Sequence, residues 1–310
     1  MRSAIPLLLL FPTISFAQTK EMVESVERKL AKQRTAKWVL EQEAPDGGFY
    51  LAPQDPKSDA APRPLLRATN GAVRALKYLG FPLLNTEREK HAAFVLKCYD
   101  PKTGAFAEPG GKPDVAISSI GVMAAMELGI PKEKFAKAMD YLKENAKTFE
   151  EVRIAAAAVE AWGVKDCPFD LKPWMEIVAK DVGGKLPPIQ SGGARVLGSV
   201  TAFTLRLGIQ QPSDTPPEKL AAAMSGGQLA DGGWAREGAK DSDMESTYRV
   251  MRAYMLLKQK PKDVKKLRAF IESHRNKDDG YAAKPGDKST MSGGYYATII
   301  TKWLDEMEKK

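Results

Sequence analysis

The chain has 310 residues, of which 43% are hydrophobic and 28% are charged. This balance is typical of a folded globular protein and excludes an extended disordered chain. The net charge of +8 is spread over lysine-rich segments, without the dense basic stripe and interleaved aromatic side chains of nucleic-acid-binding proteins. We therefore expect no nucleic-acid partner.

The first residues have the pattern of a secretory signal. A basic start is followed by an apolar run over residues 5–11 and by the small-residue cleavage site Ser15-Phe16-Ala17. Cleavage after Ala17 would divide the chain into a signal peptide, 1–17, and one mature domain, 18–310. The apolar run is too short for a membrane span, and no later stretch approaches about 20 apolar residues. The sequence predicts a secreted or periplasmic protein.

Four glycines end four similar apolar phrases and indicate an internal repeat. Leu79-Gly80-Phe81-Pro82 is the first, and Gly129, Gly163 and Gly208 close the others. Glycine just past a helix adopts the left-handed conformation that ends it, often with proline shortly afterwards. The glycines recur at roughly 35 to 50 residues, a period typical of units that stack to bury a common core.

The helices predicted between these stops form six pairs. Each pair has an outer helix with lysine and glutamate on one face and a more apolar inner helix. The outer helices are expected at 20–43, 86–98, 132–145, 171–182, 217–225 and 263–273. The inner helices are expected at 65–79, 114–128, 150–162, 194–207, 242–257 and 289–306. The sequence thus predicts an all-α protein with two concentric rings of helices, an α6/α6 toroid.

Several loops between paired helices contain Asp-Gly and an aromatic residue. They read Asp46-Gly47-Gly48-Phe49, Asp231-Gly232-Gly233-Trp234 and Asp279-Gly280-Tyr281. Asp and Gly build such a turn, and the aromatic side chain can fill the space between neighbouring units. A purely structural role is the alternative to any function of these loops taken singly.

The same loops carry a resemblance to a known superfamily. With Gln228 before it, the Trp234 loop resembles the repeat of triterpene cyclases, and the other two resemble the loops of protein prenyltransferase β subunits. Over residues 20–308 the chain is most similar to β subunits of type II geranylgeranyl transferase. The resemblance implies an α/α toroid with a central apolar cavity, whose mouth is formed by the N-terminal ends of inner helices. Such helix ends suit a diphosphate.

The resemblance also implies a zinc-dependent transferase site, which is incomplete here. Lys240 and Asp243 stand at the positions of the diphosphate-binding lysine and one zinc ligand. Glu245 stands where the family has a cysteine ligand, and Ala297 where it has a histidine. A catalytic zinc needs three protein ligands and an open position. We therefore expect no zinc cofactor, and whether the chain is an enzyme stays open.

A second catalytic reading comes from the segment before the fifth inner helix. Asp241-Ser242-Asp243-Met244-Glu245 resembles the Asp-x-Asp-Asp acid of protonating cyclases, with methionine at the fourth position. The same residues are also typical of a helix start, where a side-chain oxygen caps the first turn and acidic groups favour the dipole. Asp241, Asp243 and Glu245 are therefore candidates for catalysis, with capping as the alternative.

Further candidates lie near the predicted mouth. As ligand-binding residues the sequence suggests Lys240, Arg249, Tyr296, Asp114 and Arg153, with Arg195 beside them. For each arginine, an ion pair with a carboxylate of a neighbouring unit is the alternative.

Two functions follow from these observations. The first is a secreted toroid that binds an isoprenoid or other apolar ligand in its central cavity. Aromatic residues that face inward would support this function. If it is an enzyme, it is a prenyltransferase-type transferase. The second is a secreted scaffold whose rings present loops to a protein partner. An α-subunit-like partner and a disulfide between Cys98 and Cys167 stay open.

Overall fold

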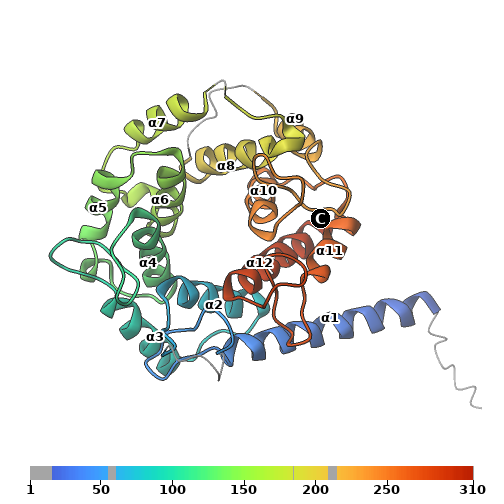
Figure 1. Ribbon diagram of the computed structural model, residues 1–310, viewed down its shortest axis with the longest axis horizontal. Coiled ribbons are helices and arrows are strands. Elements are labelled where there is room, and N and C mark those ends of the chain that lie inside the picture. Colours follow the sequence, from blue (N-terminus) through green and yellow to red (C-terminus); the bar gives the residue numbers. More distant parts are fainter. Residues whose placement is uncertain (1–15, 55–60, 184, 209–214, 310) are drawn as a thin grey trace, which may run out of the picture.

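The computed structural model describes the backbone of residues 16–54, 61–183, 185–208 and 215–309. Within these ranges twelve α-helices form two concentric rings, and no strand is present beyond isolated bridges in loops (Figure 1). The all-α toroid of six helix pairs is therefore confirmed. In the same ranges no helix is long and apolar enough to cross a membrane.

Inner and outer helices alternate along the chain. The inner ring consists of α2 (Leu66–Leu79), α4 (Val115–Glu127), α6 (Phe149–Trp162), α8 (Gly193–Arg206), α10 (Met244–Leu257) and α12 (Met291–Glu308). The outer ring consists of α1 (Phe16–Leu40), α3 (Asn85–Lys97), α5 (Lys137–Asn145), α7 (Lys172–Val182), α9 (Pro217–Ser225) and α11 (Val264–Ser273). Each inner helix packs against the next, and α12 packs against α2, which closes the ring.

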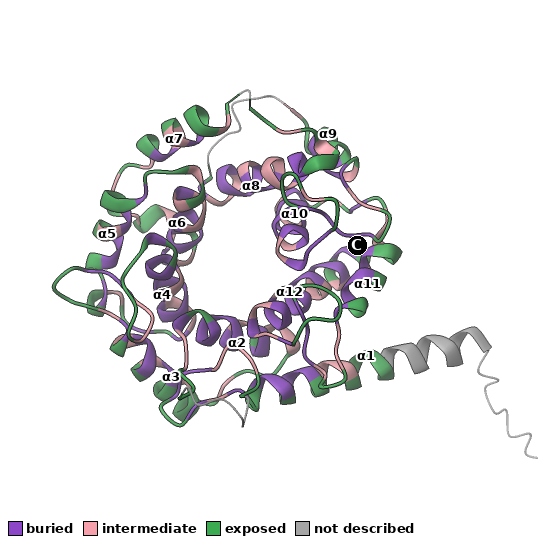
Figure 2. Ribbon diagram, viewed as in Figure 1, coloured by how far each residue is buried: buried purple, intermediate pink, exposed green. Residues whose placement is uncertain are grey.

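Burial follows this division into two rings. Figure 2 shows mostly buried residues in the inner helices and exposed faces on the outer helices. In α6 the run Ala155-Ala156-Ala157-Ala158 is buried, because short side chains allow the neighbouring inner helices α4 and α8 to approach closely. The hydrophobic core is therefore the layer between the two rings. The axis of the toroid is bordered by the inward-facing side chains of the inner helices.

The glycines that end the inner helices behave as predicted at three of the four stops. Gly80, Gly129 and Gly208 have φ of +88°, +72° and +64°, the left-handed region, and no neighbouring atom would obstruct a side chain. Glycine is used there for its conformation rather than for space. Gly163 also has positive φ, +104°, but an extended ψ.

The aromatic residues of the loops pack between neighbouring units, as expected. Phe49, Phe106 and Trp234 are completely buried. The backbone N–H of each donates to a hydroxyl on the following inner helix, namely Thr69, Ser118 and Thr247, over 3.0, 3.1 and 3.0 Å. This repeated bond ties each loop to the start of its inner helix and sets the height at which the helix enters the ring.

Some boundaries differ from the predicted ones. The third outer helix is divided into a 3₁₀ turn at Lys132–Lys134 and α5, because Phe135 leaves the helical conformation at φ −141° and is fully buried. The first helix begins at Phe16, so the predicted cleavage site lies at its start, whereas residues 1–15 of the predicted signal lie outside the described residues. Cys98 and Cys167 are free thiols.

Candidate functional site

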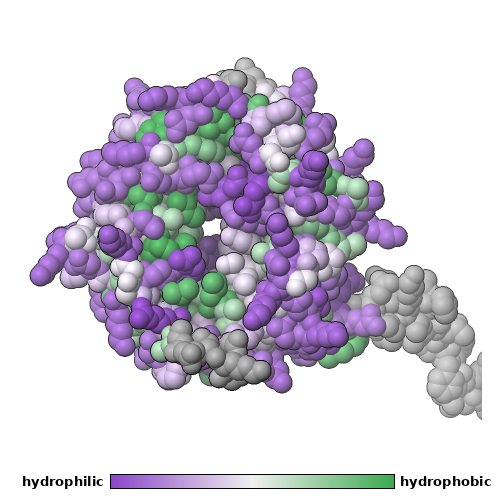
Figure 3. All heavy atoms as spheres, in the orientation of Figure 1, coloured by the Kyte–Doolittle hydropathy of each residue, from purple (hydrophilic) through white to green (hydrophobic). Residues whose placement is uncertain are grey.

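Two adjoining chambers occupy the axis of the ring. The N-terminal chamber, of about 290 Å³, lies toward the N-terminal ends of the inner helices, and the C-terminal chamber, of about 590 Å³, lies toward their C-terminal ends. Both are lined by Arg74, Met123, Ala157 and Arg252. We call these four residues the waist, together with Arg206, which lines the N-terminal chamber alone. Figure 3 shows a hollow near the middle of one face, bordered largely by hydrophilic residues.

Tyrosines form one wall of the N-terminal chamber. Tyr248 of α10 and Tyr295 and Tyr296 of α12 all line it. The Tyr248 ring is stacked on Tyr296 at 4.7 Å and on Trp303 at 5.8 Å, so Trp303 supports the wall from behind. Tyr254 points the other way, and its hydroxyl donates to the Ala221 carbonyl over 2.8 Å. The aromatic residues of the last two inner helices whose direction the sequence leaves open are Tyr248, Tyr254, Tyr295, Tyr296 and Trp303, and three of them, Tyr248, Tyr295 and Tyr296, face the cavity.

A network of ion pairs surrounds the mouth of the N-terminal chamber. Arg249 of α10 donates to Glu150 of α6 over 2.8 Å and to Glu245 over 2.6 Å. Arg153 pairs with Glu150 at 3.0 Å, and Arg195 of α8 lies 3.9 Å from Glu245. Burial by itself would raise the pKa of Glu150, but Arg153 and Arg249 outweigh it and hold this pKa below its usual value. The mouth is thus a largely self-compensated layer of charge that joins three inner helices.

The waist has a different charge balance. Arg74 of α2, Arg206 of α8 and Arg252 of α10 all line the N-terminal chamber. Arg206 and Arg252 are each only 7% exposed. Among the described residues the one carboxylate paired with this trio is Glu160, 3.1 Å from Arg206. Arg74 and Arg252 instead donate to the hydroxyls of Tyr78 and Tyr248 over 3.1 and 3.0 Å.

This excess of positive charge acts on Tyr248. Burial would raise the pKa of the Tyr248 phenol, but Arg252, Arg206 and Arg74 outweigh it and lower the pKa to about 6. The ordinary value is about 10. In the folded protein the phenolate therefore forms above about pH 6, and it contributes stability that increases up to about pH 10 and is lost as the pH falls through 6.

We expect a spectrophotometric pH titration to show one tyrosinate appearing near pH 6, well before the other tyrosines ionise. Tyr248→Phe should remove this early step and leave the alkaline steps in place. Tyr50→Phe, outside the ring's axis, is the matched control and should keep it. A wild-type titration without tyrosinate below pH 8 would contradict the expectation.

The residues predicted from sequence divide into two groups. Arg153, Glu245, Arg249 and Tyr296 do line the N-terminal chamber. The other five lie elsewhere. Arg195 lies 3.9 Å from Glu245 but lines neither chamber. Asp114 and Asp243 are the N-caps of α4 and α10 and accept the backbone N–H of Ile117 and Ser246, while Lys240 and Asp241 are exposed in the loop before α10 and line neither chamber.

Sequence reasoning did not find the waist. Arg74, Arg206 and Arg252 lie in the middle or last turn of inner helices, whereas the residues predicted from sequence lie nearer the helix starts. A signal was present: Arg74 and Tyr78, and Tyr248 and Arg252, are spaced four residues apart on helices otherwise read as apolar. Charged groups on the inner face of an inner ring would have pointed to a polar axis.

The residues at the zinc positions of the family do not fit a zinc ion. The carboxylate of Asp243 accepts from the backbone N–H and the hydroxyl of Ser246, both at 2.8 Å, and from Arg236 at 3.3 Å. Glu245 is held by Arg249, and Ala297 carries no ligand atom. Across the described residues no group of three His, Cys, Asp or Glu side chains is placed for a metal.

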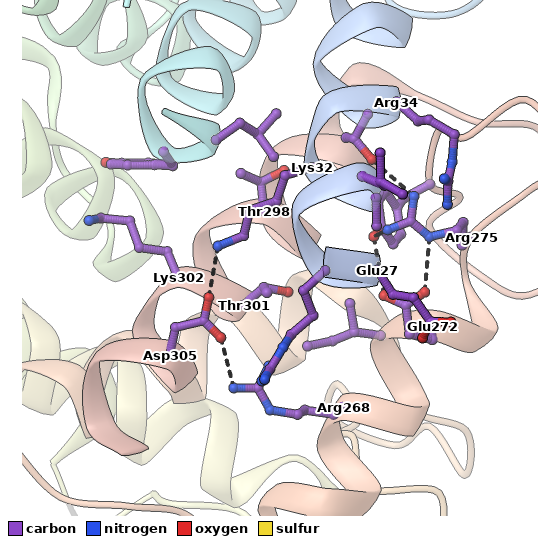
Figure 4. Close-up of a pocket in the computed structure, with 18 residues that line it drawn as sticks. Glu27, Lys32, Arg34, Arg268, Glu272, Arg275, Thr298, Thr301, Lys302 and Asp305 are labelled. Carbon is purple, nitrogen blue, oxygen red and sulfur yellow. Dashed lines mark hydrogen bonds and ion pairs between the residues drawn. The ribbon is translucent and has the colours of Figure 1, made fainter. Parts of the chain in front are cut away.

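A further hollow, of about 620 Å³, lies outside the ring between α1, α11 and α12 (Figure 4). Lys32 of α1 and Arg268 of α11 both donate to Asp305 of α12 over 2.9 Å. Glu272 accepts from Arg275 over 2.9 Å. These ion pairs join the first and last helix pairs. Because the charges are matched within the protein, this hollow is a weaker candidate for ligand binding than the chambers.

Solved structures of similar fold include a terpene cyclase, a protein geranylgeranyltransferase and a glycosidase. The type II terpene cyclase MstE from Scytonema is 12% identical, with a TM-score of 0.61 over 91% of this chain and 98% of its own. A variant of MstE in complex with its substrate geranylgeranyl dihydroxybenzoate is 11% identical, with a TM-score of 0.60 over 93% of this chain and 100% of its own. Protein geranylgeranyltransferase-I from Candida albicans, complexed with GGPP, is 12% identical, with a TM-score of 0.57 over 79% of this chain and 85% of its own.

At these identities the structures show a shared fold. No curated protein sequence matches the chain at a significant level. The model of one family, described as the prenyltransferase alpha-alpha toroid domain, matches residues 6–163 and 193–308. These segments make up most of the chain and contain the walls of both chambers. The chain therefore belongs to the prenyltransferase alpha-alpha toroid family.

Proposed function

We propose that this protein binds an isoprenoid, or another small molecule with a long apolar body, in the chambers at the axis of its ring. The observation that carries the proposal is the wall of Tyr248, Tyr295 and Tyr296, whose rings face the N-terminal chamber. Aromatic faces offer broad, rigid apolar area to a hydrocarbon chain. The isoprenoid ligands of MstE and of the Candida transferase support this choice among apolar molecules.

The scaffold alternative fits the axis less well. A ring used only to present loops would be stabilised by a filled centre, with Met and Leu side chains in contact across it. Here the two chambers share the apolar side chains of Met123 and Ala157 and the two arginines Arg74 and Arg252, and the space between them is open. Concave sites with an apolar wall and a few polar groups are typical of small-molecule binding.

Zinc-dependent transfer is not part of the proposal. The carboxylates of Asp243 and Glu245 already cap a helix and neutralise an arginine, and a metal would have to displace both contacts. We propose binding without zinc-activated chemistry. We also propose that the protein is exported, which intact-mass measurement of the mature chain would test: the mass should correspond to residues 18–310.

Calorimetric titration of the mature protein with geranylgeranyl diphosphate tests the proposal. We expect micromolar binding that does not change when zinc is added. Tyr296→Ala should weaken it roughly tenfold, because a ring that contacts the ligand contributes on the order of 1–2 kcal/mol. Lys240→Ala, an exposed change outside both chambers, should bind as the wild type does.

Two results would contradict the proposal. One is the absence of heat at millimolar ligand in a protein shown to be folded. The other is binding that Lys240→Ala abolishes while Tyr296→Ala leaves it intact, because the ligand would then lie on the outer loop rather than in the ring. Binding tightened strongly by zinc would instead restore the transferase reading.

A further inference from the structure

The waist holds three arginines against two anions, the Glu160 carboxylate and, above about pH 6, the Tyr248 phenolate. In Arg74, Arg206 and Arg252 the Nε–H groups are buried and have no hydrogen-bond partner among the described residues. Arg206 lies 3.1 Å from Glu160, but without the alignment of a hydrogen bond. Buried charged groups are normally paired, and an unpaired one is costly. An anion placed here would relieve that cost.

The surrounding aromatic rings compensate only part of the charge. The guanidinium of Arg252 lies 4.6 Å from the Trp303 ring centre, and that of Arg74 lies 5.5 Å from the Tyr295 ring centre. Such contacts stabilise a cation by about 1–2 kcal/mol, well below a buried ion pair. They hold the guanidinium planes in place.

At the mouth of the N-terminal chamber the charges are better matched, although the Nε–H of Arg195 is also buried without a hydrogen-bond partner among the described residues. There Arg153, Arg195 and Arg249 share two carboxylates, which are 52% and 39% exposed. An incoming anion would compete with Glu150 and Glu245 for the same donors. The family resemblance places an anionic head group at this mouth, whereas the charges of this chain favour the waist.

Cations also flank the waist on its other side. Lys77 and Arg88 line the C-terminal chamber, where Lys77 pairs with Glu127 at 2.6 Å and Arg88 donates to the Glu127 carbonyl over 3.3 Å. The carboxylates lining this chamber are Glu127 and Glu160, and each already has a cationic partner. The electrostatic potential therefore remains positive from the waist into the C-terminal chamber.

We propose that the waist is an oxyanion-binding site, in which Arg74, Arg206 and Arg252 hold a phosphate, sulfate or carboxylate group at the head of the ligand. The apolar body of that ligand lies along the tyrosine wall of the N-terminal chamber, and this part rests on the proposed function. Guanidinium groups suit such a head because their N–H donors are arranged as a planar fork that matches two oxygens.

Three probes titrated into the full mature protein separate the head group from the body. They are geranylgeranyl diphosphate, the uncharged geranylgeraniol, and inorganic diphosphate. We expect the diphosphate ester to bind at least tenfold more tightly than the alcohol, and inorganic diphosphate to bind measurably by itself. Sulfate and acetate, each titrated alone, then show whether the site prefers a phosphate, a sulfate or a carboxylate.

Arg252→Met is the deciding variant. It should weaken the diphosphate ester and inorganic diphosphate roughly 10- to 100-fold, because a lost charge-assisted hydrogen bond has an effect of that size, and leave the alcohol unchanged. Arg252→Lys should recover part of the loss. Arg63→Met, an exposed arginine of the loop before α2, is the matched control. Arg252→Met is expected to fold, since it removes a buried charge that no carboxylate pairs.

The outcomes distinguish the two proposals. If the alcohol and the diphosphate ester bind equally, or if Arg252→Met binds inorganic diphosphate as the wild type does, the oxyanion site is wrong and the proposed function stands. If inorganic diphosphate binds and Arg252→Met abolishes this, but the isoprenoid chain adds nothing, the site stands and the proposed function fails. If no probe binds to folded protein, both are wrong.

Discussion

Trp234→Ala is expected to lower the free energy of unfolding by about 3–5 kcal/mol, the usual cost of removing a fully buried large aromatic side chain. Trp234 is completely buried between α9 and α10. Its indole N–H donates to the Met224 carbonyl over 2.8 Å, and its ring lies 6.0 Å from that of Tyr254. Removing it would leave a cavity and take one of two donors from the Met224 carbonyl, which also accepts the backbone N–H of Gly227 over 3.1 Å. Chemical denaturation followed by circular dichroism measures the change.

Two further variants separate these contributions. Trp234→Phe keeps most of the volume and loses the N–H donor, so it should cost about 0.5–1.5 kcal/mol, the net contribution of one hydrogen bond. Phe81→Ala changes an aromatic residue that is 38% exposed in the loop after α2, and should cost much less than either. Equal destabilisation by Trp234→Ala and Phe81→Ala would refute the structural role of the loop aromatic.

The double variant Glu150→Gln, Glu245→Gln is expected to destabilise the protein by about 3 kcal/mol, because it leaves a buried arginine without a counter-charge. Arg249 is only 9% exposed, and its two carboxylate partners lie on α6 and α10. Adding Arg249→Met should recover most of the loss, since an apolar side chain of similar length replaces a buried ion pair at little cost. Thermal and chemical unfolding at neutral pH measure both steps.

The pH dependence of this double variant gives a second check. The pKa of Glu150 lies below its usual value in the folded protein, so the stability from its ionisation is fully present above the unfolded-state value of about 4.3. It is lost as the pH falls through the lower folded-state pKa. The gap between wild type and variant should therefore close in acid. A gap that is constant from pH 7 to pH 3 would show that the carboxylates act through packing rather than charge.

The two layers of charge at the axis, the mouth and the waist, have different expected roles. At the mouth, carboxylates occupy the donors of Arg249 and Arg153, and the network holds neighbouring inner helices together. At the waist, the buried Nε–H groups of Arg74, Arg206 and Arg252 have no partner among the described residues, and positive charge is in excess. Substitutions at the mouth should therefore change stability more than affinity, and substitutions at the waist the reverse.

The sequence alone was sufficient for the architecture of this protein. Helix stops such as Gly80 depend on backbone conformation, and the Asp-Gly-aromatic loops depend on turn chemistry, so both are encoded within a few residues. Each helix pair has an apolar face that it cannot bury alone, and stacking the pairs into a closed double ring buries all of these faces. Helix ends were less certain, as at Phe135, where burial of one ring divides a predicted helix.

The candidate site was decided only by the tertiary structure. Residues predicted at helix starts, such as Asp114 and Asp243, satisfy backbone N–H groups of their own helices, a role that local sequence cannot distinguish from ligand binding. Arg74, Arg206 and Arg252 lie on three helices that are far apart in the chain, and each alone looks like an ordinary surface or paired arginine. Closure of the ring brings them to one waist. The energetic effect of a buried charge depends on which other charges lie near it in the folded protein, and the sequence alone does not give those neighbours.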